Sequence, residues 1–389
     1  MLLRRTAALA GMAACMALAA GPWTWSGSYP ENAATLLLLG DVSVEHRADP
    51  VTALVHVRDT LERADLVYGN LEGLLVKSQG PDKDIPDKSG WQHIGPEAVE
   101  LLKAGNIAVV GVANNVAYGR DNIMKSLAVL DAHGILHTGA GANLEEAHRP
   151  AIVERKGIRF GFLQYTAKWY IADQQIATPA APGVARILSP DGISLDPGDL
   201  RRLREDIRRL RPQVDVVVVS SHNRDGLAGR PTASAPRPAG EAEAPDSLFK
   251  PIPLGSRFTH AEPYEKELAH AAIDAGADIV YGHGSHVLQG VEVYKGKPIL
   301  YCLGNFVTDW IRMRPNKDGL VVRVVAEGKN VLRVSMVPVT RDPENNVMML
   351  DPSSGEGAVL MRKVEALSPG VPLRIDGHEA VLVERGARD

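Results

Sequence analysis

Short runs of consecutive apolar residues recur along the chain without polar–apolar alternation. Runs of this kind are typical of strands that are buried on both faces of a sheet. The first is the four-leucine run Leu36–Leu39, which leads directly into Gly40 and Asp41. The pattern predicts strands at 36–39, 65–68, 107–112, 159–163, 214–219, 278–281 and 299–303.

Segments with helical spacing of apolar residues lie between these runs. In the charged segment 199–210, for example, leucine or isoleucine stands at 200, 203, 207 and 210. Because strands and helices alternate, the chain favours an α/β layered fold. After Leu320 the pattern changes, and two apolar runs follow each other without a helix between them. The predicted helices are 96–104, 121–133, 199–210 and 264–275, and the two late runs are 321–325 and 331–334.

The first residues have the composition of an export signal. Arg4 and Arg5 precede a short apolar stretch that ends in small residues, as in a secretory signal peptide. Cys15 offers an alternative, a lipidated cysteine in a lipoprotein signal. We therefore expect an exported protein that is periplasmic, extracytoplasmic or attached to the membrane through its N-terminus.

The remaining chain divides by regularity. Seven prolines, Pro263 included, make the stretch from Arg224 to Pro263 the least regular part, and so long an irregular segment is either functional or mobile. The expected organisation is a signal peptide at 1–20, a linker at 21–34, one domain at 35–340 with an irregular insertion at 224–263, and a C-terminal extension at 341–389.

Composition excludes some functions. The net charge is −4 and the isoelectric point about 6.3, which leaves no basic footprint for nucleic acid. Aromatic residues make up only 5%, too few to indicate a stacking platform for bases. After signal removal Cys302 is the single cysteine, so no internal disulfide is expected. Its apolar neighbours predict a small core residue.

Polar residues stand where the predicted strands end. In open α/β sheets ligands collect at the carboxyl ends of strands, and carboxylate, amide and imidazole groups suit zinc, manganese or iron. Taken singly, each residue except the His283 and His286 pair is better explained by a cap, a turn or an ordinary loop position, whereas the set favours a divalent-metal site. Six candidate ligands suit two ions, which could share a carboxylate and stabilise phosphoryl transfer. The candidates are Asp41, Glu72, Asn115, His222, His283 and His286.

Several short motifs resemble one family, the capsule synthesis CapA proteins, which are linked to poly-γ-glutamate capsules. The resemblance runs from about Thr35 to about Val339. It implies an α-β-β-α sandwich of the calcineurin-like metallophosphoesterase type in an envelope protein. The motifs are Leu39-Gly40-Asp41-Val42, Gly69-Asn70-Leu71-Glu72-Gly73, Val112-Ala113-Asn114-Asn115, Thr138-Gly139-Ala140-Gly141, Gly282-His283-Gly284-Ser285-His286-Val287-Leu288-Gln289-Gly290 and Leu303-Gly304-Asn305-Phe306-Val307.

The same resemblance implies metal ligation by the six candidates, with Glu72 in the bridging place. The chain departs from the family pattern at Val116, where a histidine that donates a proton or stabilises the transition state is usual. Loss of such a group costs on the order of 10²–10⁴ in rate. Asn223 and Arg224 replace a tryptophan and a glycine, and His46 replaces an arginine. His222 and Arg224 are the candidate catalytic residues, and Arg224 or His46 could compensate for Val116.

The first functional hypothesis is an exported protein that uses divalent metal, as two Mn, Zn or Fe ions, in synthesis or export of an envelope polymer. Its expected partners are an anionic polymer or the membrane machinery that makes it. A positive groove is one interpretation of five basic residues, and solvated surface charge is the other. The alternatives are an extracytoplasmic metal-dependent phosphoesterase and a non-catalytic binding protein supported by metal. The basic residues are Arg120, Lys168, Arg224, Arg230 and Arg237.

Overall fold

The computed structural model describes residues 23–45, 47–77, 93–167, 175–223, 260–310 and 315–384. The predicted signal at 1–20, His46, and the insertion up to residue 259 with Arg224 lie outside the described residues. No helix in the described ranges is long and apolar enough to cross a membrane.

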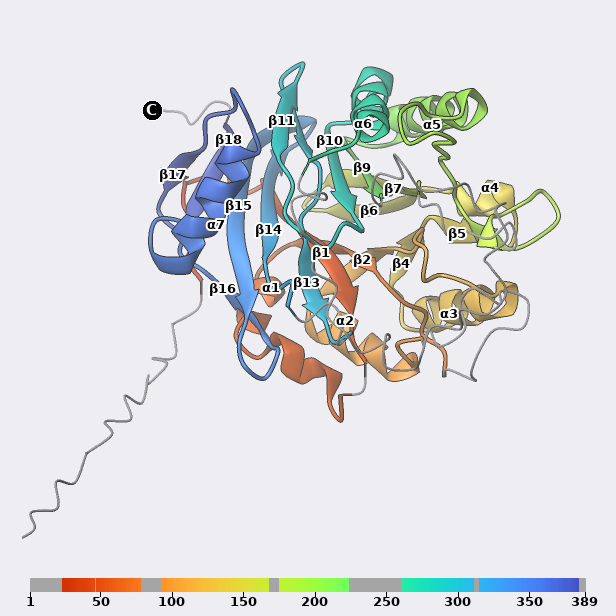
Figure 1. Cartoon of the computed structure of the whole chain (residues 1–389), viewed down its shortest axis with the longest axis horizontal. Coiled ribbons are helices and arrows are strands. Elements are labelled where there is room, and N and C mark those ends of the chain that lie inside the picture. Colours follow the sequence, from red (N-terminus) through yellow and green to blue (C-terminus); the bar gives the residue numbers. More distant parts are fainter. Residues whose placement is uncertain are drawn as a thin grey trace, which may run out of the picture.

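The larger sheet combines a parallel half with an antiparallel half (Figure 1). β1 at its centre pairs in parallel with β2 and β13 and antiparallel with β14. The strand order is β17 (Arg374–Asp376), β18 (Glu379–Glu384), β15 (Asn330–Arg341), β14 (Gly319–Glu327), β1 (Ala34–Ser43), β2 (Leu66–Leu71), β3 (Ile107–Gly111) and β4 (Leu136–Thr138), with β13 (Asn305–Thr308) on β1 and β16 (Val347–Met349) on β15.

The second sheet packs face to face with the first. Its four central strands are parallel, and an antiparallel strand closes each edge. The order is β11 (Val291–Tyr294), β12 (Lys297–Leu300), β10 (Ile279–His283), β9 (Val216–His222), β7 (Ile158–Thr166) and β6 (Ala151–Arg155); β5 (Ala140–Gly141) and β8 (Gly183–Val184) form a separate pair.

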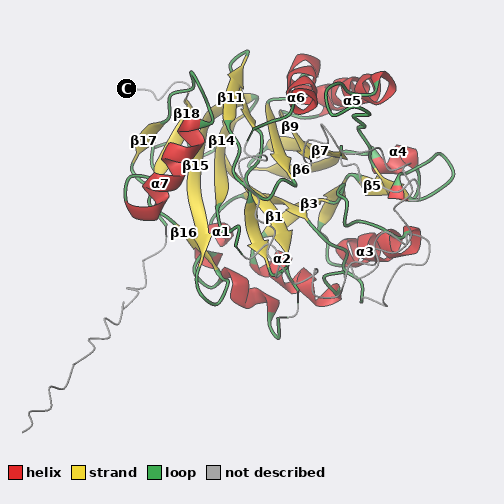
Figure 2. Ribbon diagram, in the orientation of Figure 1, coloured by secondary structure: helices red, strands yellow, loops and turns green. Residues whose placement is uncertain are grey.

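Most of the helices cover the outer faces of the two sheets (Figure 2), whereas the helix at Gly355–Ala366 packs into the core between them. Their termini are specified locally: Asp196 caps α5 by accepting from two backbone N–H groups, and a capping box of Glu262 and Glu265 starts α6. The helices are α1 (Arg58–Glu62), α2 (Val99–Ala104), α3 (Arg120–Ala132), α4 (Leu144–Ala147), α5 (Pro197–Leu210), α6 (Pro263–Ala275) and α7 (Gly355–Ala366), with 3₁₀ turns at Pro50–Leu54, Pro96–Ala98 and Arg211–Gln213.

Three apolar cores separate the layers. Leu37 and Leu39 of β1 face the core under α1, α2 and α3, whereas Leu36 and Leu38 face the core between the sheets. A third core lies between the second sheet and helices α5 and α6. A central strand is therefore buried on both sides, which explains its uninterrupted leucine run. The order of layers is α-β-β-α, and the predicted fold class is confirmed.

Residues after Arg341 are integrated into this architecture. β18 pairs with β15, and α7 places Leu360 and Val364 in the core between the sheets. The segment before β1 is also attached, because the backbone N–H of Ser26 donates to Glu379 at 2.8 Å. Residues on both sides of the segment 35–340 therefore pack against it. Their contacts join residues far apart in the sequence, so no local sequence pattern predicts them.

Candidate metal centre

The six predicted ligands lie together at the carboxyl ends of strands from both sheets. Asp41 lies near the C-terminal end of β1, and Glu72 directly follows β2. His222 and His283 end β9 and β10 and stand side by side in the parallel register. Every one of the six is at most 5% exposed, although each carries a polar or charged side chain: Asp41, Glu72, Asn115, His222, His283 and His286.

Asp41 is enclosed by hydrogen-bond donors and imidazoles. Its Oδ1 lies 3.2 Å from Nδ1 of His283, and its Oδ2 lies 3.3 Å from Nδ1 of His286. Asn70 Nδ2 donates to Oδ1 at 2.8 Å. Burial alone would raise the pKa of this carboxyl, but the hydrogen bonds and charge of His283 and His286 hold it well below its usual value. Asp41 is therefore a carboxylate at neutral pH.

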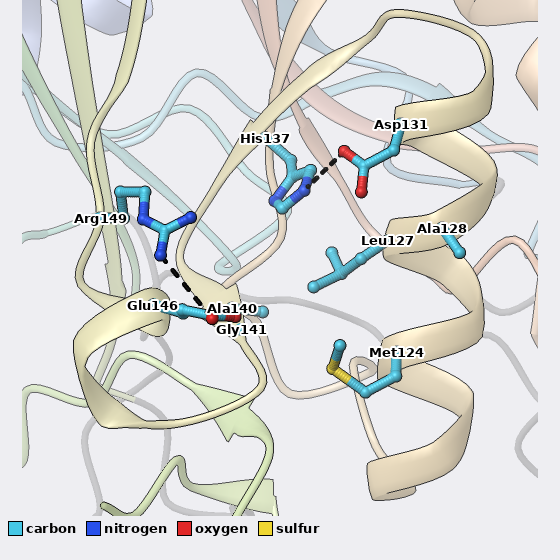
Figure 3. Close-up of a pocket in the computed structure, with 9 residues that line it drawn as sticks. All are labelled: Met124, Leu127, Ala128, Asp131, His137, Ala140, Gly141, Glu146 and Arg149. Atoms are coloured by element: carbon cyan, nitrogen blue, oxygen red, sulfur yellow. Dashed lines mark ion pairs between the residues drawn. The ribbon is translucent and has the colours of Figure 1, made fainter.

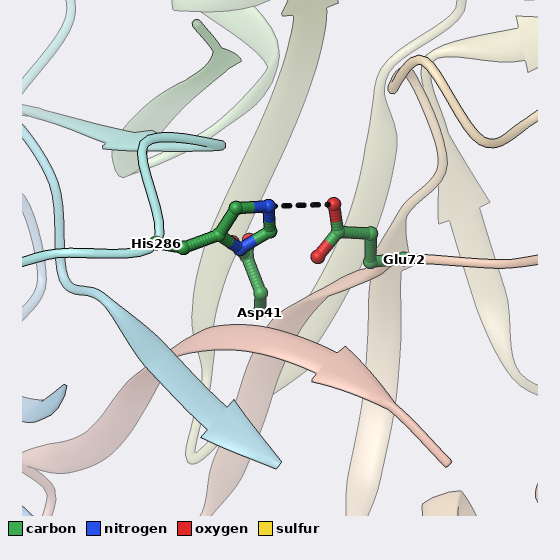
Figure 4. A group of neighbouring side chains, drawn as sticks. All are labelled: Asp41, Glu72 and His286. Atoms are coloured by element: carbon green, nitrogen blue, oxygen red, sulfur yellow. Dashed lines mark ion pairs between the residues drawn. The ribbon is translucent and has the colours of Figure 1, made fainter. Parts of the chain in front are cut away.

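Glu72 stands between two groups of candidates. Its Oε1 lies 3.6 Å from Nε2 of His286 and 3.8 Å from Nε2 of His222. The same His222 nitrogen lies 2.8 Å from Oδ1 of Asn115. Figure 4 shows Asp41, Glu72 and His286 turned toward one another. Glu72 thus lies between His286 on one side and His222 with Asn115 on the other.

Backbone geometry explains the small residues around the histidines. A Cβ on Gly284, which has φ of +95°, would lie 2.1 Å from the carbonyl oxygen of Asn223. His286 itself has φ of +58°, in the left-handed region that few residues other than glycine adopt. Such a conformation persists where the surroundings impose it. The tight turn therefore directs both His283 and His286 toward Asp41.

A buried amide network orients Asp41 from the opposite side. Oδ1 of Asn70 accepts from Gln164 Nε2 at 3.0 Å and from Asn114 Nδ2 at 3.2 Å, which leaves its Nδ2 to donate to Asp41. Gln164 fits because residue 111 is glycine: a Cβ there would lie 2.4 Å from the Gln164 carboxamide. The sequence motif around Asn70 predicted no role for this residue, and Gln164 had no sequence signal.

The donor set fits a divalent cation. Ligand atoms of Asp41, Glu72 and His286 all lie within 4.8 Å of one another. Nε2 of His283 is buried and has no hydrogen-bond partner among the described residues. A buried polar atom of this kind calls for an explanation such as an ion. The buried Asp–Glu–His group can therefore hold a metal ion.

The remaining sequence candidates have different surroundings. Val116 is buried at the position after Asn115 and brings no polar group to the site. Arg120 donates to the carbonyl oxygen of Pro182 at 2.6 Å, and the other four basic candidates lie outside the described residues. Cys302 is buried as predicted; burial and the charge of Asp41 raise the pKa of its thiol to about 12.

A surface pocket lies apart from these ligands, between α3 and the segment 137–149 (Figure 3). Its charged groups pair with each other: His137 with Asp131 at 3.3 Å and Arg149 with Glu146 at 3.7 Å. None of the six candidates lines it.

Fold and site together define a two-sheet α/β protein with a buried carboxylate–imidazole centre at its strand ends. Residues 35–244 and 255–310 match the family described as bacterial capsule synthesis protein PGA_cap. This match covers most of the chain, and the protein belongs to that family.

Several proteins show similarity over most of the chain. The capsule biosynthesis protein CapA of Bacillus anthracis is 25% identical over 316 residues, 78% of this chain and 67% of that protein. The PGA biosynthesis protein CapA of Bacillus subtilis is 25% identical over 328 residues, 80% of this chain and 73% of that protein. A probable polyglutamine synthesis accessory protein of Mycobacterium tuberculosis is 29% identical over 254 residues, 63% of this chain and 56% of that protein.

Among solved structures, a hypothetical protein from Thermus thermophilus is 17% identical. The structural match covers 81% of this chain and 99% of that protein, with a TM-score of 0.44.

Proposed function

We propose that this protein is an exported, metal-dependent accessory protein in the synthesis or export of an anionic capsule polymer of the poly-γ-glutamate type. Family membership and the names of the Bacillus and Mycobacterium relatives support the capsule role. The convergence of six buried ligand candidates at the strand ends is the observation that carries the metal. The basic and apolar N-terminal segment supports export.

The centre holds two divalent ions in this proposal. Asp41, Glu72 and His286 would hold one ion, and Glu72, Asn115, His222 and His283 would hold the other. The distances from Glu72 Oε1 to His286 and to His222 support the shared carboxylate. Manganese, zinc and iron all suit this set of oxygen and nitrogen ligands.

The bound ions would supply a Lewis acid for a phosphoryl or carbonyl oxygen and a water of lowered pKa. The chain itself supplies positioning. Asn70 and the backbone N–H of Gly284 hold the carboxylate of Asp41 in place. Burial of the whole group excludes bulk water, which strengthens the electrostatic interactions within it. Val116 offers no proton at the place of the family histidine, so proton donation would fall to His46 or to the substrate, whereas Arg224 would stabilise the charge of the transition state.

Purified protein tests the metal directly. We expect manganese, zinc or iron at close to two ions per chain by elemental analysis, and loss of at least one ion in His283→Ala. A matched control is His137→Ala, which removes a histidine of the surface pocket and should keep both ions. A wild-type chain that retains no divalent ion after incubation with Mn²⁺ would contradict the proposal.

Turnover separates the enzymatic alternative from binding alone. Phosphodiester and phosphomonoester p-nitrophenyl substrates with added Mn²⁺ test a stand-alone phosphoesterase, and hydrolysis should vanish in His283→Ala. The apolar Val116 favours the second alternative, a non-catalytic binding protein. In that case the wild type binds metal without turnover, and Val116→His raises ester hydrolysis because it restores an imidazole for proton transfer.

Gene deletion tests the capsule role. Loss of extracellular anionic polymer in the deletion strain, restored by the wild-type gene and not by His283→Ala, is the expected result. Unchanged polymer with measurable ester hydrolysis would favour the phosphoesterase instead.

A further inference from the structure

We propose that Asn305 is a positioning residue for the metal centre: its carboxamide oxygen fixes the tautomer and ring orientation of His286. This inference rests on the proposed metal function. It assigns a role to Asn305 of the Gly304-Asn305 motif, a residue outside the set of six candidate ligands.

The topology places Asn305 next to the first ligand. β13 runs parallel to β1, with Asn305 paired to Asp41 in the register. The two strands approach so closely that a Cβ on Gly40 would lie 2.3 Å from the carbonyl oxygen of Gly304. The backbone N–H of Asp41 donates to that same oxygen at 3.2 Å. Asn305 is fully buried, so its side chain has little freedom to point elsewhere.

The hydrogen bonds of Asn305 define which end of its amide faces the centre. Its Nδ2 donates to the carbonyl oxygen of Asn316 at 3.2 Å. Its Oδ1 therefore faces His286, whose Nδ1 lies 2.9 Å away. An amide oxygen only accepts, so this contact favours the tautomer of His286 that carries its proton on Nδ1.

That tautomer leaves the other ring nitrogen ready to coordinate. Nε2 of His286 faces Glu72 at 3.6 Å, and without a proton it presents a lone pair to the space between Glu72 and Asp41. Asp41 Oδ2 also lies 3.3 Å from Nδ1, but Asp41 is itself a candidate ligand. Asn305 is therefore the neutral acceptor dedicated to His286. Partners of this kind hold metal-bound histidines in their orientation.

The left-handed backbone of His286 makes this partner more important. A residue with φ of +58° is not held by a regular helix or strand, so its ring depends on side-chain contacts. Removing a partner of this kind from other metal sites costs roughly 10–100-fold in metal affinity.

The test compares full-length wild type with two substitutions of similar size. Asn305→Asp keeps an acceptor opposite Nδ1, and Asn305→Leu removes it. Mn²⁺ affinity is measured by calorimetry, and Co²⁺ coordination by its visible absorption, at several pH values. We expect Asn305→Leu to weaken Mn²⁺ binding roughly 10–100-fold and to change the Co²⁺ spectrum, and Asn305→Asp to retain wild-type affinity.

The matched control is Asn106→Ala. Asn106 donates to backbone carbonyl oxygens of Leu61 and Ala64 at the start of β3, the opposite end of the sheet. It should leave Mn²⁺ affinity unchanged while lowering stability. If Asn305→Leu does not fold, Asn305→Ser takes its place, because a serine is too short to reach Nδ1.

Equal Mn²⁺ affinity in the wild type and in a folded variant that lacks the acceptor would overturn the positioning role while leaving the metal centre intact. A loss of Mn²⁺ affinity in Asn305→Asp, which keeps the acceptor, would overturn the positioning role as well. Failure of the wild type to bind Mn²⁺ or Co²⁺ would instead overturn the proposed function.

Discussion

Two clusters of buried charge lie in different parts of this molecule, and they differ in how their charge is balanced. Beneath β17 and β18, the fully buried Arg333 donates to Glu379 at 3.2 Å and to Asp376 at 2.8 Å. Arg323 donates to the same Glu379 at 3.0 Å. At the strand ends, Asp41 lies beside the imidazoles of His283 and His286 and the amide of Asn70, and Glu72 lies near the imidazoles of His286 and His222.

The difference separates a structural cluster from a functional one. A buried carboxylate that faces a guanidinium has its counter-ion within the chain. Buried carboxylates beside imidazoles have neighbours that can themselves ligate a metal, and a divalent cation bound among them can balance negative charge. Burial of charge does not by itself mark a site; the kind of partner does.

Breaking the first cluster should have the largest effect on stability. Arg333→Leu leaves Glu379 buried with one guanidinium in place of two. Removing one partner of a buried ion pair costs about 3–5 kcal/mol. We expect a loss in the free energy of urea unfolding of about that size. Arg374→Leu is the control, because it removes an exposed partner of Glu384 and should cost less than about 1 kcal/mol. Similar losses in both variants would contradict the comparison.

The second cluster should respond to metal. Saturation with Mn²⁺ at 100 times the dissociation constant raises the free energy of unfolding by about 2.7 kcal/mol. We expect a higher melting temperature of the wild type with Mn²⁺ and no such rise in Asp41→Asn. Without metal, Asp41→Asn should also lower the free energy of unfolding, because the donors and imidazoles around Asp41 stabilise its carboxylate in the folded state. The control is Asp191→Asn, in an exposed turn, which should show the same rise in melting temperature with Mn²⁺ as the wild type. An equal rise in Asp41→Asn would contradict metal binding at this centre.

The smallest expected effect concerns pH. Burial and the nearby carboxylates of Asp309 and Glu72 raise the pKa of Glu45 to about 7. A raised carboxyl pKa stabilises the fold below its usual value near 4.5, and this contribution is lost as pH rises to about 7. Glu45→Gln should therefore reduce the fall in unfolding free energy between pH 5 and 7, by about 1–2 kcal/mol after solvent screening.

Circular dichroism during urea titrations at each pH measures this effect. Glu62→Gln on α1, whose partner is Arg58 in an exposed pair, should keep the wild-type profile. A wild-type profile in Glu45→Gln would contradict the raised pKa.

The layers and the position of the site were predictable because both depend on local pattern. Leu36–Leu39 specifies a strand buried on both faces, and parallel strands bring their carboxyl ends to one edge. The contact of Gln164 with Asn70 was not predictable, because it joins strands of two different sheets. Arg333 alternates with apolar residues in β15 and so resembles an exposed position. Its burial depends on β17 and β18, which come more than forty residues later in the chain.

The six ligand candidates come from both layers of the sandwich. Asp41, Glu72 and Asn115 lie near or after the ends of strands of one sheet, and the three histidines lie at or after the ends of strands of the other. A cation bound by these residues would link the two sheets to each other. Local opening between the two sheets would then be rarer when metal is bound. Slower amide hydrogen exchange in β2 and β9 would report this change.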